Sequence, residues 1–148
     1  MVGIIVTGHG NFATGLTSSV KLIAGMPELY ETVDFVQEDS VEDLETNLNA
    51  AIDNLKEDCK EGILIFTDLV GGSPFKTSVE ISLTREEKIV VLGGTNLGML
   101  VEISMARTFM DDLDALAQMA VNTGQTQVMR YEFKERVVED IDDFEDGI

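Results

Sequence analysis

The chain has 148 residues, of which 44% are hydrophobic and 26% charged, so it is long enough to form one globular domain with a sizeable core. Its 28 acidic and 10 basic residues give a net charge of −18, which argues against nucleic acid or an anionic membrane as a partner, because phosphate contacts depend on Lys and Arg. Because Cys59 is the only cysteine, we expect no internal disulfide. The sequence has no basic leader and no run of the roughly 20 apolar residues that a membrane span requires. We therefore expect a cytoplasmic protein that is not embedded in a membrane.

In the first half of the chain, apolar runs alternate with segments of helical periodicity. A nearly continuous apolar run over residues 1–7 predicts a strand that is buried on both faces. Apolar side chains then recur every three or four residues over 12–23, which predicts a helix. Residues 31–36 favour a second strand. The clearest amphipathic helix covers 41–55, and Ser40 is its expected N-cap.

The second half continues this alternation. Short apolar runs predict buried strands over 62–67 and 88–93, and a helix is expected to begin between them, near Pro74. Two further helices are predicted over 96–110 and 111–124. The second of these has acidic residues in its first turn and a glycine at its expected end.

The last predicted element has a different pattern. Over Val128–Lys134, three apolar side chains alternate with three charged ones, which is typical of an edge strand with one wet face, and we expect this strand to be antiparallel. Residues 136–148 form an acidic tail, so we expect one domain over 1–135. Its predicted fold class is α/β, an open and mostly parallel sheet with helices on both faces.

The loops that follow the buried strands carry the residues that could perform chemistry. The first loop, Thr7–Asn11, contains His9; the second runs from Asp68 to Pro74; the third is Gly93–Asn96. In a parallel sheet all three lie at the carboxyl edge, where open α/β sheets bind ligands. This edge therefore gathers a histidine, a carboxylate, a hydroxyl and many backbone amides.

The segment Gly71-Gly72-Ser73-Pro74 is typical of a helix start that can bind phosphate. Proline suits the first helical position, and Ser73 is the expected N-cap before it. The two glycines let the backbone turn tightly and approach a ligand, and the free amides of a helix N-terminus attract anions. A plain capped helix after a tight turn would have the same pattern.

His9 is the only histidine of the chain. Because one ring nitrogen of a histidine is unprotonated near neutral pH, it can act as a general base, a metal ligand or a nucleophile. A nucleophilic role requires a carboxylate on the other ring nitrogen, and Asp68 is the candidate across the sheet edge. The alternative is a turn histidine that is bonded to a backbone carbonyl.

Several known kinds of site do not fit the sequence. No G-x-x-x-x-G-K-[ST] follows a strand, which excludes a P-loop, and GGTNLG is not the G-x-G-x-x-G of a dinucleotide site. A receiver domain requires paired acids after the first strand, and a histidine phosphatase requires an arginine where Gly8 stands. One histidine and one cysteine do not supply the ligands of a zinc site, so we expect no metal and no cofactor.

Four segments resemble the IIA component of the mannose family of the bacterial phosphotransferase system (PTS). They follow the family's order and spacing: IIVTGHG (4–10), DFV (34–36), GILIFTDLVGGSPF (62–75) and GGTNLGMLVE (93–102). The Gly-Gly-Ser-Pro-Phe run after Asp68 is the most specific of them.

The resemblance implies both an assembly and a chemistry. The last strand of the domain would be exchanged between the two subunits of a homodimer. His9 would accept a phosphoryl group from the phosphocarrier protein HPr and pass it to the IIB component of a sugar permease, which makes the protein a phosphotransferase. Asp68 matches the aspartate that orients the histidine. The phosphoryl cradle is matched by Gly71, Gly72 and Ser73.

The sequence departs from the family at two places. Leu69-Val70 stands where many members carry a polar residue and an aromatic one, and Gly98 stands where a proline is common; both line the region where partners would dock. No IIB domain follows, so we expect a free-standing IIA subunit. Two alternatives are the phosphoryl donor subunit of a dihydroxyacetone kinase and a regulatory module of the same fold without catalysis.

Overall fold

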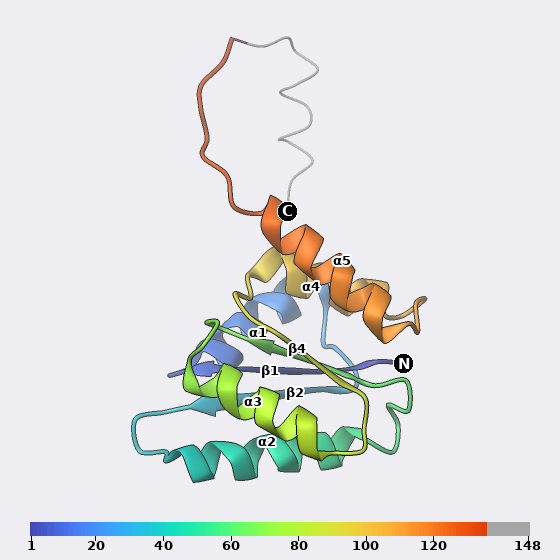
Figure 1. Cartoon of the computed structure of the whole chain (residues 1–148). Helices are drawn as coiled ribbons and strands as arrows, with labels where there is room; N and C mark the ends of the chain where they lie inside the picture. The colour runs from blue at the N-terminus through green and yellow to red at the C-terminus, as the bar shows by residue number, and fades with distance from the viewer. Residues whose placement is uncertain (136–148) are drawn as a thin grey trace.

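A parallel sheet forms the centre of the molecule (Figure 1). The computed structural model describes residues 1–135. Its strands are β1 (Gly3–His9), β2 (Tyr30–Phe35), β3 (Ile63–Thr67) and β4 (Ile89–Leu92), in the spatial order β2-β1-β3-β4. All neighbouring strands are parallel, which confirms the α/β class. Because β2 and β3 lie on opposite sides of β1, the chain reverses its winding between β1 and β3, the place where such sheets bind ligands.

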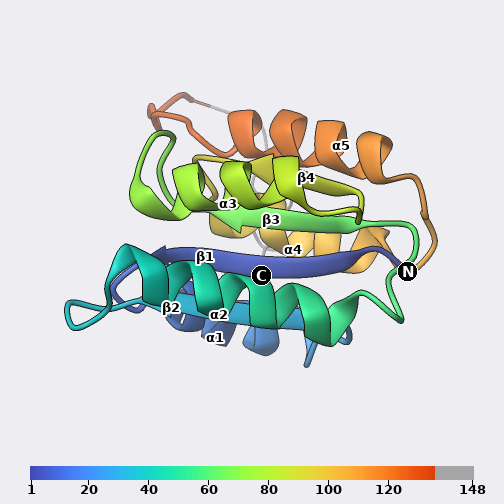
Figure 2. The ribbon, with the colours of Figure 1, turned by 60° about the horizontal axis from the view of Figure 1, so that its bottom comes forward.

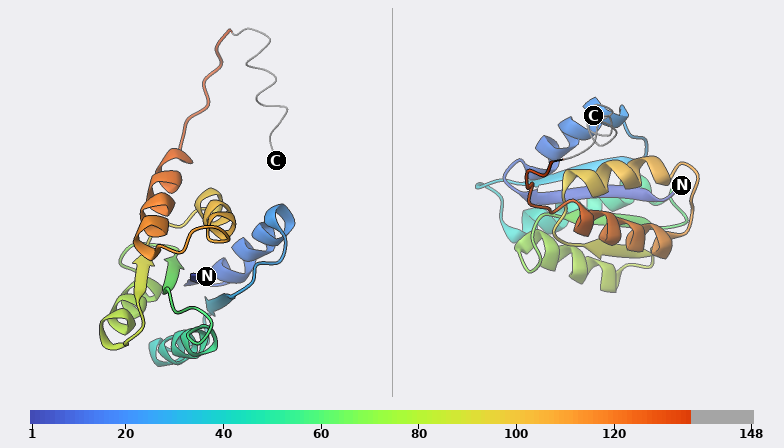
Figure 3. Two further views of the ribbon diagram at one scale, coloured as in Figure 1. Left: turned by 90° about the vertical axis from the view of Figure 1, so that its right-hand side faces the viewer. Right: turned by 90° about the horizontal axis from the view of Figure 1, so that it is seen from above.

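The helices cover both faces of the sheet, as predicted. On one face lie α1 (Phe12–Ala24), α4 (Leu97–Ala106) and α5 (Leu113–Thr126), and on the other lie α2 (Val41–Leu55) and α3 (Ser73–Thr84). The left view of Figure 3 shows these three layers, and Figure 2 shows α2 and α3 in front of the strands. No helix within residues 1–135 is both long and apolar enough to cross a membrane.

Burial on both faces explains the continuous apolar runs of the central strands. In β1, Ile4 and Val6 belong to the core beneath α1, α4 and α5, whereas Ile5 belongs to the core beneath α2 and α3. The strand β3 alternates in the same way, and all of these side chains are fully buried. Since side chains alternate along a strand, His9 is on the same face of β1 as Ile5, the face that α3 covers.

The boundaries near the site follow from local hydrogen bonds. Ser40 caps α2 as predicted, because its hydroxyl accepts the Asp43 N–H at 3.0 Å while the Asp43 carboxylate accepts the Ser40 N–H at 2.9 Å. The strand β1 continues two residues past its predicted end at Thr7. Its backbone pairs with β2 as far as the His9–Phe35 pair, so His9 is the last residue of the strand and not part of a loop.

The helix α5 continues past Gly124, the residue predicted to end it. A Cβ on Gly124 would lie 2.8 Å from the Met99 sulfur, so this glycine permits α4 and α5 to pack closely. Its carbonyl also accepts a hydrogen bond from the Asn96 amide at 3.0 Å. The glycine is therefore required by packing and does not stop the helix.

The predicted helix 96–110 ends early, at Ala106, and is followed by a buried arginine. Arg107 is only 2% exposed. Its guanidinium donates to the carbonyl oxygens of Val2 and Leu29, both at 2.9 Å, and to that of Glu28. Arg107 thereby joins the end of α4 to the segments that lead into β1 and β2.

Residues 128–135 form neither a helix nor a strand in the single chain, and they extend away from the sheet (Figure 1). The antiparallel strand predicted over 128–134 is thus not formed here, because a strand requires a neighbouring backbone and this segment leaves α5 in a direction away from β4. Val128 and Phe133 are 82% and 84% exposed. The expected acidic tail, 136–148, lies outside the described residues, so the domain boundary at 135 stays a prediction.

Candidate functional site

His9 and Asp68 meet at the carboxyl edge of the sheet, as the sequence predicted. His9 ends β1, Asp68 directly follows β3, and these two strands are neighbours. Oδ2 of Asp68 lies 2.7 Å from Nδ1 of His9 and also accepts the backbone N–H of His9 at 2.9 Å. The other oxygen accepts the Leu69 N–H at 2.8 Å. The ring is therefore held by a carboxylate and not by a backbone carbonyl, which removes the alternative of a simple turn histidine.

The Asp68 carboxyl group is held in its charged form. Burial raises its pKa, but hydrogen bonds from the backbone and ring of His9 and from the backbone of Leu69 outweigh that effect, so the pKa lies below its usual value of 3.8. The Asp68 side chain is 10% exposed and that of His9 is 47% exposed. A carboxylate can only accept hydrogen bonds, so Nδ1 of His9 carries a hydrogen, and in the neutral ring the lone pair is therefore on Nε2.

This second ring nitrogen lies near the start of α3. A Cβ on Gly72 would lie 2.9 Å from Cε1 and 3.6 Å from Nε2 of His9, so only glycine lets the backbone come this close to the ring. Gly71 before it has a φ of +84°, in the left-handed region that favours glycine. No hydrogen bond from residues 1–135 occupies Nε2, which leaves it available to react.

The N-terminus of α3 is also open, unlike those of the other helices. The helices α2, α4 and α5 are capped by the side chains that precede them (Ser40, Asn96 and Asp112). The first turn of α1 receives a carboxylate from Asp34, which accepts the Thr14 N–H at 3.0 Å. The N-cap of α3 is Gly72, which has no side chain, and its first turn has no acidic residue. The partial positive charge of this helix start favours an anion there.

Ser73 is not the N-cap that the sequence predicted. Lys76 donates its N–H to the Gly72 carbonyl at 2.9 Å, so α3 begins one residue earlier, with Ser73 first and Pro74 second. Within residues 1–135 the Ser73 hydroxyl makes no hydrogen bond. Gly71, Gly72 and Ser73 nevertheless lie together at the helix start beside the ring, as the predicted cradle requires.

The third predicted loop, 93–96, supports the site indirectly. Among the described residues, no side chain of this loop forms a hydrogen bond with the His9 ring. The Thr95 N–H donates to the Thr67 carbonyl at 3.1 Å. Thr67 is the last residue of β3 and precedes Asp68. The loop therefore fixes the end of β3, and with it the position of Asp68.

The end of β2 contributes contacts that sequence reasoning missed. The Phe35 ring meets the His9 ring edge-on, with centroids 5.9 Å apart and an angle of 62° between the planes. The Phe35 carbonyl also accepts the Gly10 N–H at 2.7 Å. The signal was present in the predicted strand 31–36, because a parallel neighbour of β1 places its last residues beside His9.

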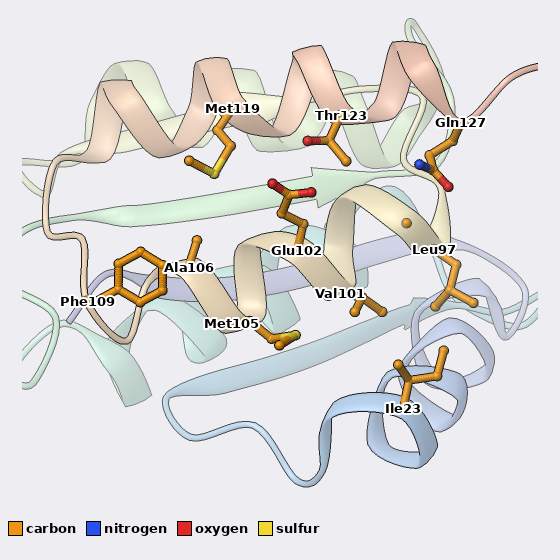
Figure 4. A pocket seen from close by; sticks show the side chains of 11 residues that line it. Ile23, Leu97, Val101, Glu102, Met105, Ala106, Phe109, Met119, Thr123 and Gln127 are labelled. Atoms are coloured by element: carbon orange, nitrogen blue, oxygen red, sulfur yellow. The ribbon is translucent and has the colours of Figure 1, made fainter. Parts of the chain in front are cut away.

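A separate apolar groove of about 760 Å³ lies between α1, α4 and α5 and contains none of these residues. Figure 4 shows it, with Met105 and Phe109 along one rim and Gln127 at one end. Met105 and Phe109 are 57% and 78% exposed. Gln127 follows α5 and leads into residues 128–135, so the groove is next to that exposed apolar segment. No cluster suited to a metal ion occurs within 1–135.

The fold and the site together define a parallel α/β domain with a histidine–aspartate pair beside an open helix N-terminus. The family model described as "PTS system fructose IIA component" matches residues 3–121. The chain therefore belongs to this family of PTS IIA components, which confirms the resemblance found in the sequence.

Individual relatives agree with this assignment. The chain is 34% identical over 127 residues to the PTS system mannose-specific EIIAB component of Escherichia coli K12, an alignment that covers 86% of this chain and 38% of that protein. It is 23% identical over 137 residues to the fructose-specific EIIA component of Bacillus subtilis, covering 93% and 92% of the two chains. The chain thus spans less than half of the mannose-specific relative and nearly all of the fructose-specific one.

Solved structures show the same fold. A PTS component EIIA from Streptococcus agalactiae superposes with a TM-score of 0.81 at 34% identity, covering 88% of this chain and 97% of that one. The mannose/sorbose-specific IIA subunit from Enterococcus faecalis gives a TM-score of 0.79 at 25% identity, covering 92% and 98%. The agreement extends over nearly the full length of both structures.

Proposed function

We propose that this protein is a phosphoryl carrier of a sugar PTS. His9 accepts a phosphoryl group from the phosphohistidine of HPr and passes it to the IIB component of a sugar permease. The observation that carries the proposal is the Asp68 bond to Nδ1, which leaves Nε2 of His9 free next to the open N-terminus of α3. Family membership supports the same reading.

The transfer is a displacement at phosphorus. The lone pair of His9 Nε2 attacks the phosphorus atom, the nitrogen–phosphorus bond of the donor breaks, and the donor imidazole keeps the electron pair. The Nδ1 hydrogen stays in the bond to Asp68, whose negative charge stabilises the positive charge that develops on the ring. The first amides of α3 lie where they can stabilise the phosphoryl oxygens in the transition state.

The polarity of the site suits a relay. No Lys or Arg occurs in 7–11, 68–74 or 93–96. Backbone dipoles stabilise the transition state without a cationic side chain that would bind the phosphorylated form tightly. The phosphoryl group can therefore move on to the next carrier with a small change in free energy.

The experiment is transfer from phosphoenolpyruvate through enzyme I and HPr to this protein and then to IIB. We expect one acid-labile phosphoryl group per chain on the wild type and none on His9→Gln. The dihydroxyacetone kinase alternative predicts instead that phosphate reaches a kinase-bound nucleotide. The regulatory alternative predicts tight partner binding without turnover. A folded wild type that takes up no phosphate would contradict the proposal.

We further propose that the protein is a homodimer in which residues 128–134 of each chain extend the sheet of the other. Support comes from β4, which is an edge strand within residues 1–135. The segment also exposes three large apolar side chains to solvent, those of Val128, Met129 and Phe133. The apolar groove of Figure 4 includes Gln127, the residue directly before this segment. A second copy would bury both surfaces.

A further inference from the structure

The connection between β1 and α1 is short, and it directly follows the reactive histidine. Only Gly10 and Asn11 separate His9 from Phe12, the first residue of α1. Gly10 has a φ of +57°, and Asn11, the N-cap of α1, makes no side-chain capping bond. This helix therefore has no cap of its own at the point where the histidine must be held.

Asp34, near the end of β2, supplies the missing cap from outside the helix. Its Oδ1 accepts the backbone N–H of Thr14 at 3.0 Å, and its Oδ2 accepts the Thr14 hydroxyl at 2.7 Å. Both oxygens thus bind one residue in the first turn of α1, which fixes the position of that turn. In the register of β1 and β2, Asp34 is opposite Gly8, the residue before His9.

The Asp34 carboxylate and the His9 ring lie on opposite faces of the sheet. Along β2, Val33 packs into the core beneath α2 and α3, and Phe35 contacts the His9 ring. Because side chains alternate along a strand, Asp34 points to the other face, toward α1. Any effect of Asp34 on His9 therefore passes through the backbone and not through contact with the ring.

We infer that Asp34 is a positioning residue for phosphoryl transfer, an inference that rests on the proposed function of His9. The turn is held by Asp68 at the His9 N–H, by the Phe35 carbonyl at the Gly10 N–H, and by Asp34 at Thr14. Without the Asp34 bonds to Thr14, the first turn of α1 and the Gly10-Asn11 connection before it can move. A nucleophile that is held less firmly reacts more slowly, whereas the docking of the phosphoryl donor is unchanged.

The test compares Asp34→Ala with Asp34→Asn. We expect the alanine variant to lower the maximal rate of His9 phosphorylation by about tenfold at an unchanged KM for the phosphorylated donor. The asparagine variant retains an oxygen for the Thr14 N–H and a donor for the Thr14 hydroxyl, so its rate should stay within about twofold of the wild type. Equal losses in both variants would assign the effect to the charge and overturn the inference.

A control variant and a second readout separate positioning from general stability. Asp112→Ala removes a similar carboxylate cap, that of α5 at the Ala115 N–H, far from His9. Hydrogen exchange at the His9 and Gly10 amides should accelerate in Asp34→Ala and stay unchanged in Asp112→Ala. This readout needs no phosphoryl transfer, so it tests whether Asp34 holds the turn separately from whether His9 takes up phosphate. Unchanged exchange at both amides in Asp34→Ala would overturn it.

Discussion

At the scale of single residues, the reactivity of His9 depends on which ring nitrogen carries the hydrogen. Asp68→Asn has one carbonyl oxygen in place of two carboxylate oxygens, so its NH₂ group must face either the Leu69 N–H or the N–H and Nδ1 of His9, and no negative charge remains to hold the hydrogen on Nδ1. We expect the rate of His9 phosphorylation to fall by about 100-fold, at the lower end of what proton positioning contributes to catalysis. The rate at which phosphorylated HPr transfers its phosphoryl group to the folded variant measures this effect. A rate equal to that of the wild type would show that Asp68 does not control the reactivity of His9.

The same carboxylate couples stability to pH. Because the folded pKa of Asp68 lies below the unfolded value of 3.8, the ionised group stabilises the fold at pH values above 3.8, and this contribution is lost as the pH falls through the lower folded pKa. We expect the free energy of unfolding of the wild type to exceed that of Asp68→Asn at neutral pH, and the difference to shrink below about pH 4. Urea unfolding at several pH values measures this; a difference that grows toward acid pH would contradict it.

Two adjacent glycines allow geometry to be separated from backbone strain. Gly72→Ala places a Cβ 2.9 Å from the His9 ring at an ordinary φ, so it should slow phosphorylation with a small loss of stability. Gly71→Ala has open space for its Cβ but a φ of +84°, so it should cost about 1 kcal/mol of stability and leave the ring in place. Urea unfolding and labelling rates on both variants test the contrast. Equal effects of the two on both quantities would contradict it.

At the scale of elements, Arg107 joins α4 to the amino ends of β1 and β2. Arg107→Met keeps most of the buried volume but removes the Arg107 donor from the carbonyls of Val2 and Glu28 and leaves that of Leu29 with the Ile4 N–H alone, which should cost about 3 kcal/mol. Lys60→Met is the control, because the Lys60 side chain is 71% exposed, lies outside the segment 128–134, and its ion pair with Glu57 at 3.2 Å contributes little. Urea unfolding measures both. A loss in the Arg107 variant no larger than that of the control would show that these bonds contribute no stability.

The elements also show which features can be read from a sequence. The N-cap at Ser40 and the nearly continuous apolar run of β1 are local patterns, and both predictions, a capped helix and a strand buried on both faces, are confirmed. The functions of Gly124 and Gly72 depend on what approaches them in space, the Met99 sulfur and the His9 ring. From the sequence alone, Gly124 could not be distinguished from a helix stop, nor Gly72 from an ordinary glycine in a tight turn.

At the scale of the whole molecule, the order of the strands in the sheet brings His9 and Asp68, which are 59 residues apart in the sequence, into one site. The sequence placed His9 and Asp68 at the same edge because both follow parallel strands, and the order β2-β1-β3-β4 makes those strands neighbours. The predicted strand 31–36 indicated that β2 could end beside His9, but the particular contacts of Phe35 and Asp34 require the register between β1 and β2, which the sequence does not give. The predicted strand 128–134 pairs with none of the four strands of the sheet within residues 1–135.

The proposed dimer gives a further prediction at this scale. Phe133 is 84% exposed in the single chain, so Phe133→Asp should leave the domain folded and convert a dimer into a monomer. Leu22→Asp is the control, because Leu22 of α1 is 89% exposed and lies outside the segment 128–134. Sedimentation equilibrium distinguishes the states. A monomeric wild type, or a Phe133→Asp variant that stays dimeric, would contradict the exchanged strand.

The central claim is that Nε2 of His9 carries the phosphoryl group, and the composition of the chain makes it directly measurable. His9 is the only histidine, so ¹⁵N-labelled histidine places two ring nitrogens in the whole molecule. After incubation with phosphoenolpyruvate, enzyme I and HPr, NMR should detect a ³¹P–¹⁵N coupling to Nε2, with Nδ1 still protonated beside Asp68. A phosphoryl group on Nδ1, or a folded protein with no phosphohistidine signal, would contradict the account.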